Sequence, residues 1–212
     1  YIGTPGQWDE AQGVMKKILD HLEIPYKIGV GEAAFYGPKL DIQIRNVYGK
    51  EDTLITIQID QMLAEKFGMV YTDSDGVKKN PYIIHRTSIG CYERTLALLI
   101  EKYAGAFPTW LAPVQVKILP IADRHHDYAR ALAEKLDKYD IRYELDDRNE
   151  KIGYKIREAQ MQKVPFMLVV GDKEAEEGTV SVRCRKDGDK GSMTADEFIA
   201  EINRRVAEKT LD

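Results

Sequence analysis

The stretch over residues 84–94 contains side chains suited to binding a polyphosphate. In it, a β-branched run that carries His85 stops at Gly90 and passes directly into a helical pattern with Arg94 in its first turn. A helix N-terminus offers unpaired N–H groups and the positive end of the helix dipole, and an arginine can clamp phosphate oxygens with two parallel hydrogen bonds. The pattern fits a nucleotide triphosphate site. An ordinary strand-to-helix turn with a surface arginine explains it equally well.

Three further segments accompany this one, over residues 31–41, 107–116 and 147–157. In order and spacing, the four segments closely resemble the threonyl-tRNA synthetases, a family of class II aminoacyl-tRNA synthetases, from Tyr1 to about Arg205. The runs Phe-Pro-Thr-Trp-Leu-Ala-Pro and Arg-Asn-Glu-Lys-Ile-Gly are the most specific, because they contain few interchangeable positions. The resemblance implies an ATP-dependent ligase that attaches threonine to its tRNA.

Composition bounds the possible architectures. At 212 residues the chain can bury one large core or two small ones, and the layout of the motifs favours two unequal units. The formal net charge of −4 excludes a global basic field, so a nucleic-acid partner has to meet local clusters of Lys and Arg.

The chain carries no signal for a membrane or for an oxidising compartment. Cys91 and Cys184 lie far apart without Cys-x-x-Cys spacing, which favours reduced thiols and a cytoplasmic location. The sequence lacks both a run of about 18 apolar residues and a basic N-terminus followed by an apolar run, so neither a membrane span nor a signal peptide is indicated. Tyr1 stands where an initiator methionine is expected, and we expect a piece of a longer protein.

The first 112 residues combine helical and strand patterns. Apolar residues at helical spacing predict amphipathic helices over about 7–22 and from Tyr92 to just before Gly105. Runs that are β-branched and punctuated by glycine predict antiparallel strands of one sheet over 26–30, 39–47, 53–60 and 82–86. Alternation then gives the sheet an apolar face with Ile42, Ile44, Ile55, Ile57 and Ile59, and a polar face with Asp41, Gln43, Thr56, Gln58 and Asp60.

A polar face on such a sheet has two explanations. Antiparallel sheets often expose one face to solvent, which accounts for the pattern as well as a ligand does. The resemblance implies instead that this face is the floor of the adenylate-forming site. It implies that Tyr36 and Lys39 lie near the amino acid and the phosphates, that Gln58 contacts substrate, and that Arg94, beside Cys91, holds the γ-phosphate of ATP bound with Mg²⁺.

His85 is the candidate metal ligand. A lone histidine at the end of a strand is more often structural, and the sequence offers no second ligand at zinc spacing. The resemblance implies that His85 is one of three ligands to a zinc ion that binds the amino and hydroxyl groups of threonine, which rejects the nearly isosteric valine. Because the resemblance places the other two ligands and an essential arginine upstream of Tyr1, we expect little or no zinc here and no activation of threonine by this chain alone.

Beyond residue 112 the pattern alternates between strand and helix. Strands are expected over 114–121, 142–145, 166–170 and 179–185, a turn over 171–178, and helices over 127–139, 152–162 and 194–208. This order predicts an α/β domain with a mostly parallel mixed sheet. It resembles the anticodon-binding domain of class II synthetases, so we expect domains at 1–112, the end of a catalytic domain of α+β type, and at 113–212.

The resemblance implies that this second domain binds the anticodon at the ends of its strands and at the start of the helix over 152–162. Unstacked bases are read through hydrogen bonds on their edges, which Asn, Arg and Glu side chains can make. Two groups follow from the resemblance: Asn149, Glu174 and Arg183 for base readout, and Lys151, Lys155 and Arg157 for phosphate positioning. A solvated charged face is the alternative, and Asn149 can also simply cap the helix.

Two functions of different classes follow. The first is the C-terminal part of a threonine–tRNA ligase whose partners are threonine tRNA, threonine and ATP, and whose full-length family forms homodimers. The second is a free-standing synthetase-derived module that binds tRNA or protein without catalysis. The first is favoured, because the motifs over residues 36–94 show no decay of the kind that release from catalysis should produce.

Overall fold

The computed structural model describes residues 1–211 and divides into two compact units, with the division after Leu98. The N-terminal unit comprises residues 1–98, and the C-terminal unit begins at Leu99. Helix α3 (Tyr92–Tyr103) contains the point of division. Within the described residues, no helix combines the length and the apolar character that a membrane span requires.

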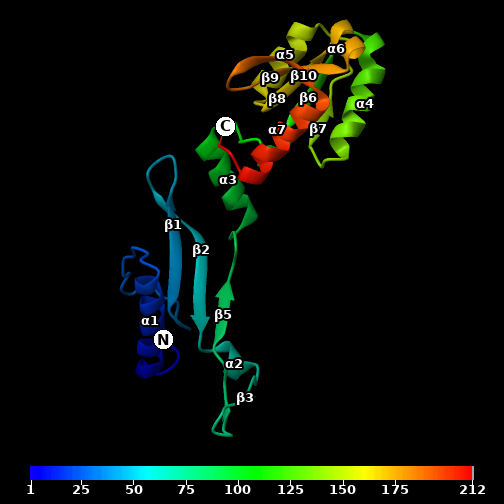
Figure 1. The fold of residues 1–212 in the computed structure, drawn as a ribbon. Helices are drawn as coiled ribbons and strands as arrows, with labels where there is room; N and C mark the ends of the chain where they lie inside the picture. Colours follow the sequence, from blue (N-terminus) through cyan, green and yellow to red (C-terminus); the bar gives the residue numbers. More distant parts are fainter. Residues whose placement is uncertain (212) are drawn as a thin grey trace. The chain divides into compact units, whose positions relative to one another are not determined.

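The N-terminal unit is built on a three-stranded antiparallel sheet with the order β1-β2-β5 (Figure 1). Its helix α1 begins with a capping box in which Thr4 and Gln7 satisfy each other's backbone N–H groups. The elements of the unit before α3 are α1 (Pro5–His21), β1 (Lys39–Arg45), β2 (Glu51–Asp60), α2 (Leu63–Lys66), β3 (Tyr71–Thr72), β4 (Lys78–Lys79) and β5 (Ile83–Arg86).

The strand expected over residues 26–30 does not form, and that prediction was wrong. The segment is irregular, and its apolar side chains Ile28 and Val30 are 74% and 91% exposed. Apolar composition suggested a strand, but a strand needs a neighbour to bond, and β1 pairs only with β2 in this sheet.

The register of β1 and β2 establishes the polar face. Asp41 pairs with Thr56 and Lys39 with Gln58, so Asp41, Thr56 and Gln58 share one face, as alternation predicted. The register then slips between Ile42 and Gln43, so that Leu54 is an extra residue of β2. This bulge turns Thr53 to the polar side, where its hydroxyl accepts a 2.9 Å hydrogen bond from the Gln43 amide.

The C-terminal unit is an α/β domain with a mixed sheet, as predicted, and the sheet has five strands. The strand order is β10-β9-β8-β6-β7. Strands β8, β6 and β7 are parallel to one another, β9 is antiparallel to β8, and β10 is antiparallel to β9. The elements are β6 (Val116–Pro120), η1 (Asp123–His125), α4 (His126–Asp137), β7 (Tyr143–Leu145), α5 (Ile152–Met161), β8 (Phe166–Val170), α6 (Asp172–Glu177), β9 (Thr179–Cys184), β10 (Gly188–Thr194) and α7 (Ala195–Glu208).

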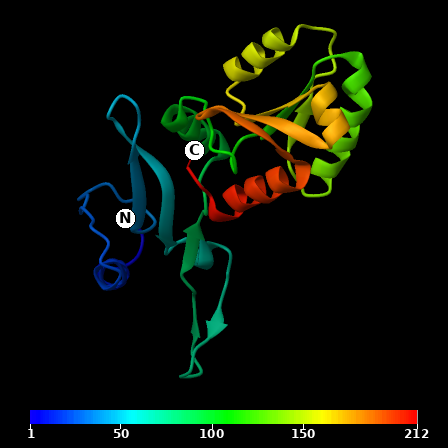
Figure 2. The same cartoon turned by 45° about the horizontal axis from the view of Figure 1, so that its top comes forward.

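Helices cover both faces of this sheet (Figure 2). On one face the strands pack against α4 and α7, and the buried cluster includes Leu132, Leu136, Leu168, Val182, Phe198 and Ile202. On the other face α5 packs through Ala159 on Leu119 and Met167, so this second core is small. Polar side chains of the strands therefore remain near α5.

Two elements of the C-terminal unit differ from expectation. The predicted turn over 171–178 contains helix α6, which ends at Gly178 in the left-handed conformation. Strand β10 was not predicted, because its residues from Gly188 to Ser192 are polar or glycine and carry no alternation. It forms by pairing with β9 in a hairpin.

Candidate substrate face and nucleic-acid interface

On the N-terminal unit, the sheet aligns three predicted site residues in one row. Gln58 pairs with Lys39 on one side and with His85 on the other. The Tyr36 hydroxyl donates a 3.0 Å hydrogen bond to Gln58 Oε1. Gln58 is buried, and its Nε2 has no hydrogen-bond partner among residues 1–211. A buried donor without a partner is costly, so Gln58 is the residue of this row whose polar groups are not all satisfied.

Gly37 brings Tyr36 to this row. A Cβ at Gly37 would lie 1.7 Å from the backbone oxygen of Ile59, so only glycine allows the loop to run this close to β2. On either side of Gly37, the Gln61 N–H donates to Tyr36 O at 2.9 Å and the Ile59 N–H to Pro38 O at 3.1 Å. The loop is thereby fixed to the end of the strand that carries Gln58.

Lys39 and Asp41 form an ion pair at the edge of the same face. Lys39 Nζ lies 2.5 Å from Asp41 Oδ2, and the Thr56 hydroxyl donates to Asp41 Oδ1 at 2.7 Å. Burial alone would raise the pKa of Asp41, but these bonds from Lys39 and Thr56 outweigh it and lower the pKa. The carboxylate therefore stays charged and holds the Lys39 ammonium beside Gln58.

His85 is held by a buried carboxylate that sequence reasoning placed on this face without a role. Asp60 is 1% exposed, and its Oδ2 lies 3.0 Å from His85 Nε2. Burial raises the pKa of Asp60, but the N–H groups of Leu63 and Met62, together with His85, lower it below its usual range. The ionised carboxylate only accepts hydrogen bonds, so His85 Nε2 carries a proton and donates it to Asp60. The two residues meet because Asp60 is diagonal to His85 in the register of β2 and β5, which only the structure shows.

These residues do not by themselves make a zinc site. Residues 1–211 contain no cluster of three His, Cys, Asp or Glu side chains that could hold a metal ion. A histidine whose ring N–H meets a carboxylate is nevertheless the arrangement that metal-bound histidines usually show. His85 therefore fits one ligand of an incomplete set.

Arg94 is anchored by the bulge of β2. Its Nη1 donates to the Thr53 carbonyl at 2.6 Å, and Gly90 lets the preceding loop approach the Leu54 carbonyl. The neighbouring Glu93 carboxylate accepts from Cys91 Sγ at 2.8 Å, which lowers the pKa of Glu93. The position of Arg94 thus depends on β2 and on its bulge. No local sequence pattern predicted the bulge.

On the C-terminal unit, the parallel strands place three loops at one edge. We call this the carboxyl edge, formed by residues 121–125, 146–151 and 171–174, which follow β6, β7 and β8. Asn149 and Glu174 both lie there.

The three predicted base readers lie in different settings. Asn149 is exposed and does not cap α5, because the N-cap is Lys151, whose side chain makes no capping bond. Glu174 Oε2 accepts from the Gly171 N–H at 2.9 Å, so this carboxylate also supports its own loop. Arg183 pairs with Met167 in the register of β9 and β8, three residues before the end of β8, or roughly 10 Å along the strand from the carboxyl edge.

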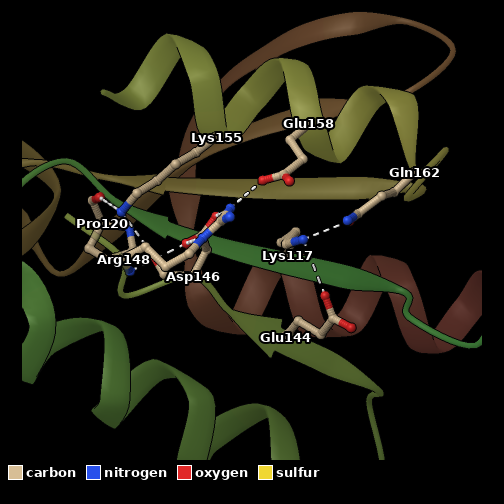
Figure 3. A network of polar contacts seen from close by, with 8 residues as sticks. All are labelled: Lys117, Pro120, Glu144, Asp146, Arg148, Lys155, Glu158 and Gln162. Atoms are coloured by element: carbon tan, nitrogen blue, oxygen red, sulfur yellow. Dashed lines mark hydrogen bonds and ion pairs between the residues drawn. The ribbon is translucent and has the colours of Figure 1, made fainter. Parts of the chain in front are cut away.

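Lys155 requires a correction. We expected it to position phosphates, but it is 2% exposed, and its Nζ donates to Pro120 O at 3.2 Å and to Asp146 O at 2.9 Å (Figure 3). A buried ammonium bonded to two carbonyls is not accessible to a phosphate. Lys151 and Arg157 are exposed, as phosphate contact requires.

A second charged group, formed by Asp146, Arg148 and Glu158, holds the loop after β7. Asp146 is buried and accepts from Arg148 Nε at 2.8 Å and from Nη2 at 2.7 Å, and Arg148 also pairs with Glu158 of α5 (Figure 3). The bidentate bond from Arg148 lowers the pKa of Asp146 despite burial. The same pairs raise the pKa of Arg148.

A third network at the carboxyl edge was not predicted. Asp172 accepts from Arg124 Nε at 2.7 Å and Nη2 at 2.6 Å, and lies 2.9 Å from Nε2 of the buried His125. The Arg124 and His125 bonds lower the pKa of Asp172. Because His125 Nδ1 accepts the Ala122 N–H at 3.1 Å, its proton is on Nε2. Asp172 lies more than forty positions after Arg124 and His125 along the chain, so no local pattern indicated the contact.

Both units match known families of protein domain. Residues 4–103 match the tRNA synthetase class II core domain (G, H, P, S and T), and residues 115–205 match the anticodon binding domain. The chain is 59% identical over 209 residues to the threonine–tRNA ligase of Clostridium perfringens strain SM101, and 51% identical over 210 residues to that of Caldanaerobacter subterraneus. The chain belongs to the threonyl-tRNA synthetase family.

A solved structure within the threonyl-tRNA synthetase family shares this fold. The RNA binding domain of threonyl-tRNA synthetase from Cryptosporidium parvum Iowa II superposes with a TM-score of 0.86 at 33% identity, over 96% of this chain and 52% of that one. The chain spans only 32% of the length of the Clostridium perfringens relative, although 99% of the chain takes part in that match.

Proposed function

We propose that this chain contributes one wall of the aminoacylation site and the anticodon-binding domain of a threonine–tRNA ligase. The proposal places the boundary between the two domains after residue 112. The observation that carries it is the row of Lys39, Gln58 and His85 on one face of the sheet, which the Tyr36 hydroxyl joins through its hydrogen bond to Gln58.

In this proposal, Tyr36 and Gln58 contact threonine or its adenylate. Tyr36 is already bonded to Gln58, so the two present a fixed pair of polar groups. Lys39 and Arg94 stabilise the phosphates of ATP, which binds together with Mg²⁺. Cys91 lies beside Arg94 at the same site. A guanidinium has five N–H donors, so Arg94 keeps donors for a phosphate after bonding Thr53.

His85 supplies one zinc ligand, and further groups of the ligase supply the others. When bound, the metal offers a coordination position that a hydroxyl fills and that the methyl group of valine cannot. Asp60 orients the His85 ring for this role. Because the described residues do not complete the zinc set, we expect this chain alone not to activate threonine.

The C-terminal unit binds the anticodon of threonine tRNA. Asn149, Glu174 and Arg183 read bases, and the exposed Lys151 and Arg157 bind phosphates. A separation of roughly 10 Å between Arg183 and the carboxyl edge suits splayed bases rather than a single nucleotide. The ligase works as a cytoplasmic homodimer.

The test is a titration of the 212-residue chain with the anticodon stem-loop RNA of threonine tRNA and with a stem-loop whose anticodon bases are changed. We expect preference for the native anticodon, and its loss in Asn149→Ala and Arg183→Ala. Arg130→Ala is the matched control, because Arg130 is exposed on α4, which packs on the opposite face of the sheet. Equal, salt-sensitive binding of both RNAs by the unaltered chain contradicts base readout and leaves phosphate attraction alone.

A further inference from the structure

Lys155 is one of the largest fully buried side chains of the C-terminal unit. Desolvating an ammonium is costly unless its N–H groups are bonded. Both hydrogen bonds that the Nζ group makes go to backbone carbonyls, those of Pro120 and Asp146. A methionine of similar length could fill this space without a buried charge, so the ammonium itself needs an explanation.

The two carbonyls lie where neighbouring strands part. The ladder between β6 and β7 ends at Ile118 and Leu145, followed only by the bond from the Asp146 N–H to Ile118 O at 3.0 Å. From there β6 continues beside β8 alone, as far as the pair of Pro120 and Val170. Lys155 Nζ joins the two chain segments beyond the last ladder bond (Figure 3).

The loop that starts at Asp146 is therefore tied to α5 from two sides. Lys155 holds the Asp146 carbonyl, and the Asp146 carboxylate holds Arg148, which in turn pairs with Glu158. Asn149 is the next residue. It has no capping bond to fix it, so the order of the loop comes from these neighbours.

We propose that Lys155 is a positioning residue for anticodon readout, which fixes the loop over 146–151 so that Asn149 meets its base in one orientation. This inference rests on the proposed function in anticodon binding. A displacement of the loop leaves phosphate attraction intact and removes discrimination between bases, because discrimination depends on hydrogen-bond geometry.

The experiment compares Lys155→Met with Lys151→Met in the 212-residue chain, using the native and altered anticodon stem-loops at several salt concentrations. We expect Lys155→Met to lower the preference for the native anticodon by roughly fivefold or more, with an unchanged salt slope. Lys151 is exposed, so Lys151→Met should weaken binding of both RNAs equally and reduce the salt slope by about one contact. An equal loss for both RNAs in Lys155→Met would overturn the proposal.

The double variant Asn149→Ala with Lys155→Met shows whether Lys155 acts through Asn149. We expect no further loss of preference beyond that of Asn149→Ala. If the unaltered chain shows no preference, the proposed function fails. If it shows a preference that Asn149→Ala removes and Lys155→Met leaves intact, only the positioning role fails.

A measurement on the unaltered chain covers the case in which Lys155→Met does not fold. We expect backbone order parameters over residues 147–150 to match those of α5. Values below about 0.6, typical of a flexible segment, would show that the loop is not fixed and would overturn the proposal.

Discussion

Replacing Gly90 with alanine tests whether the loop before α3 depends on its contact with the bulge of β2. Gly90 has φ +68°, and a Cβ there would lie 2.1 Å from the Leu54 oxygen. Gly76 has a similar φ of +78°, but a Cβ there meets nothing within 4 Å. The two glycines belong to the same unit, so Gly76→Ala is a matched control for the conformational term.

The expected difference follows from this geometry. An L-residue in the left-handed region costs about 1–2 kcal/mol, and both variants bear that cost. Real Cβ atoms essentially never approach within 3.0 Å, so in Gly90→Ala the backbone has to move by roughly 1 Å, an overpacking that costs about 1–3 kcal/mol more. The 2.6 Å bond from Arg94 to Thr53 is strained by the same movement. Gly90→Ala should therefore be about 2 kcal/mol less stable than Gly76→Ala.

Urea unfolding of the N-terminal unit measures this difference. Trp8 lies in that unit, and a Trp110→Phe background removes the fluorescence of the other tryptophan. With a slope of about 1–2 kcal/mol per M, the midpoint of Gly90→Ala should fall roughly 1–2 M below that of Gly76→Ala. Equal midpoints for the two variants would refute the argument that contact with the Leu54 carbonyl constrains Gly90.

Two further predictions concern the C-terminal unit, followed by Trp110 fluorescence with the other tryptophan replaced. Thr194→Ala removes the cap that accepts the Glu197 N–H at 3.2 Å, and should lower the free energy of unfolding by about 1 kcal/mol; an unchanged urea midpoint would contradict it. Asp146→Asn loses the charged acceptor of Arg148 and should cost roughly 1–2 kcal/mol at pH 7, a figure reduced because the guanidinium is half exposed. Since the folded pKa of Asp146 is lowered, its contribution is complete above the unfolded value of about 3.9 and is lost as the pH falls through the folded pKa. The gap between variant and unaltered chain should thus shrink in acid, and a constant gap from pH 7 to about pH 2 would contradict this.

Local chemistry was sufficient to predict much of the fold. The strand Phe166–Val170 and the helix that follows Thr194 lie where composition and capping residues placed them. Alternation also assigned the polar face of β1 and β2 as far as the bulge. Each of these features depends on residues within a few positions of one another, so its signal is written in the sequence. Strand β10 and the irregular segment over 26–30 escaped prediction, because strand formation depends on a partner and not on composition alone.

The arrangement of charges was decided by tertiary structure. The family resemblance named Lys155 and His85 as candidate site residues, but it could not show that Lys155 is buried under two strand ends or that Asp60 holds His85. Partners of these groups lie 9, 25 and 35 positions away along the chain. The sequence therefore determined which side chains this protein possesses and, through its motifs, which family it resembles. Packing determined which of them are buried. A charged side chain that is surrounded by backbone hydrogen-bonding groups has a structural role, whereas one that stays exposed can bind a ligand.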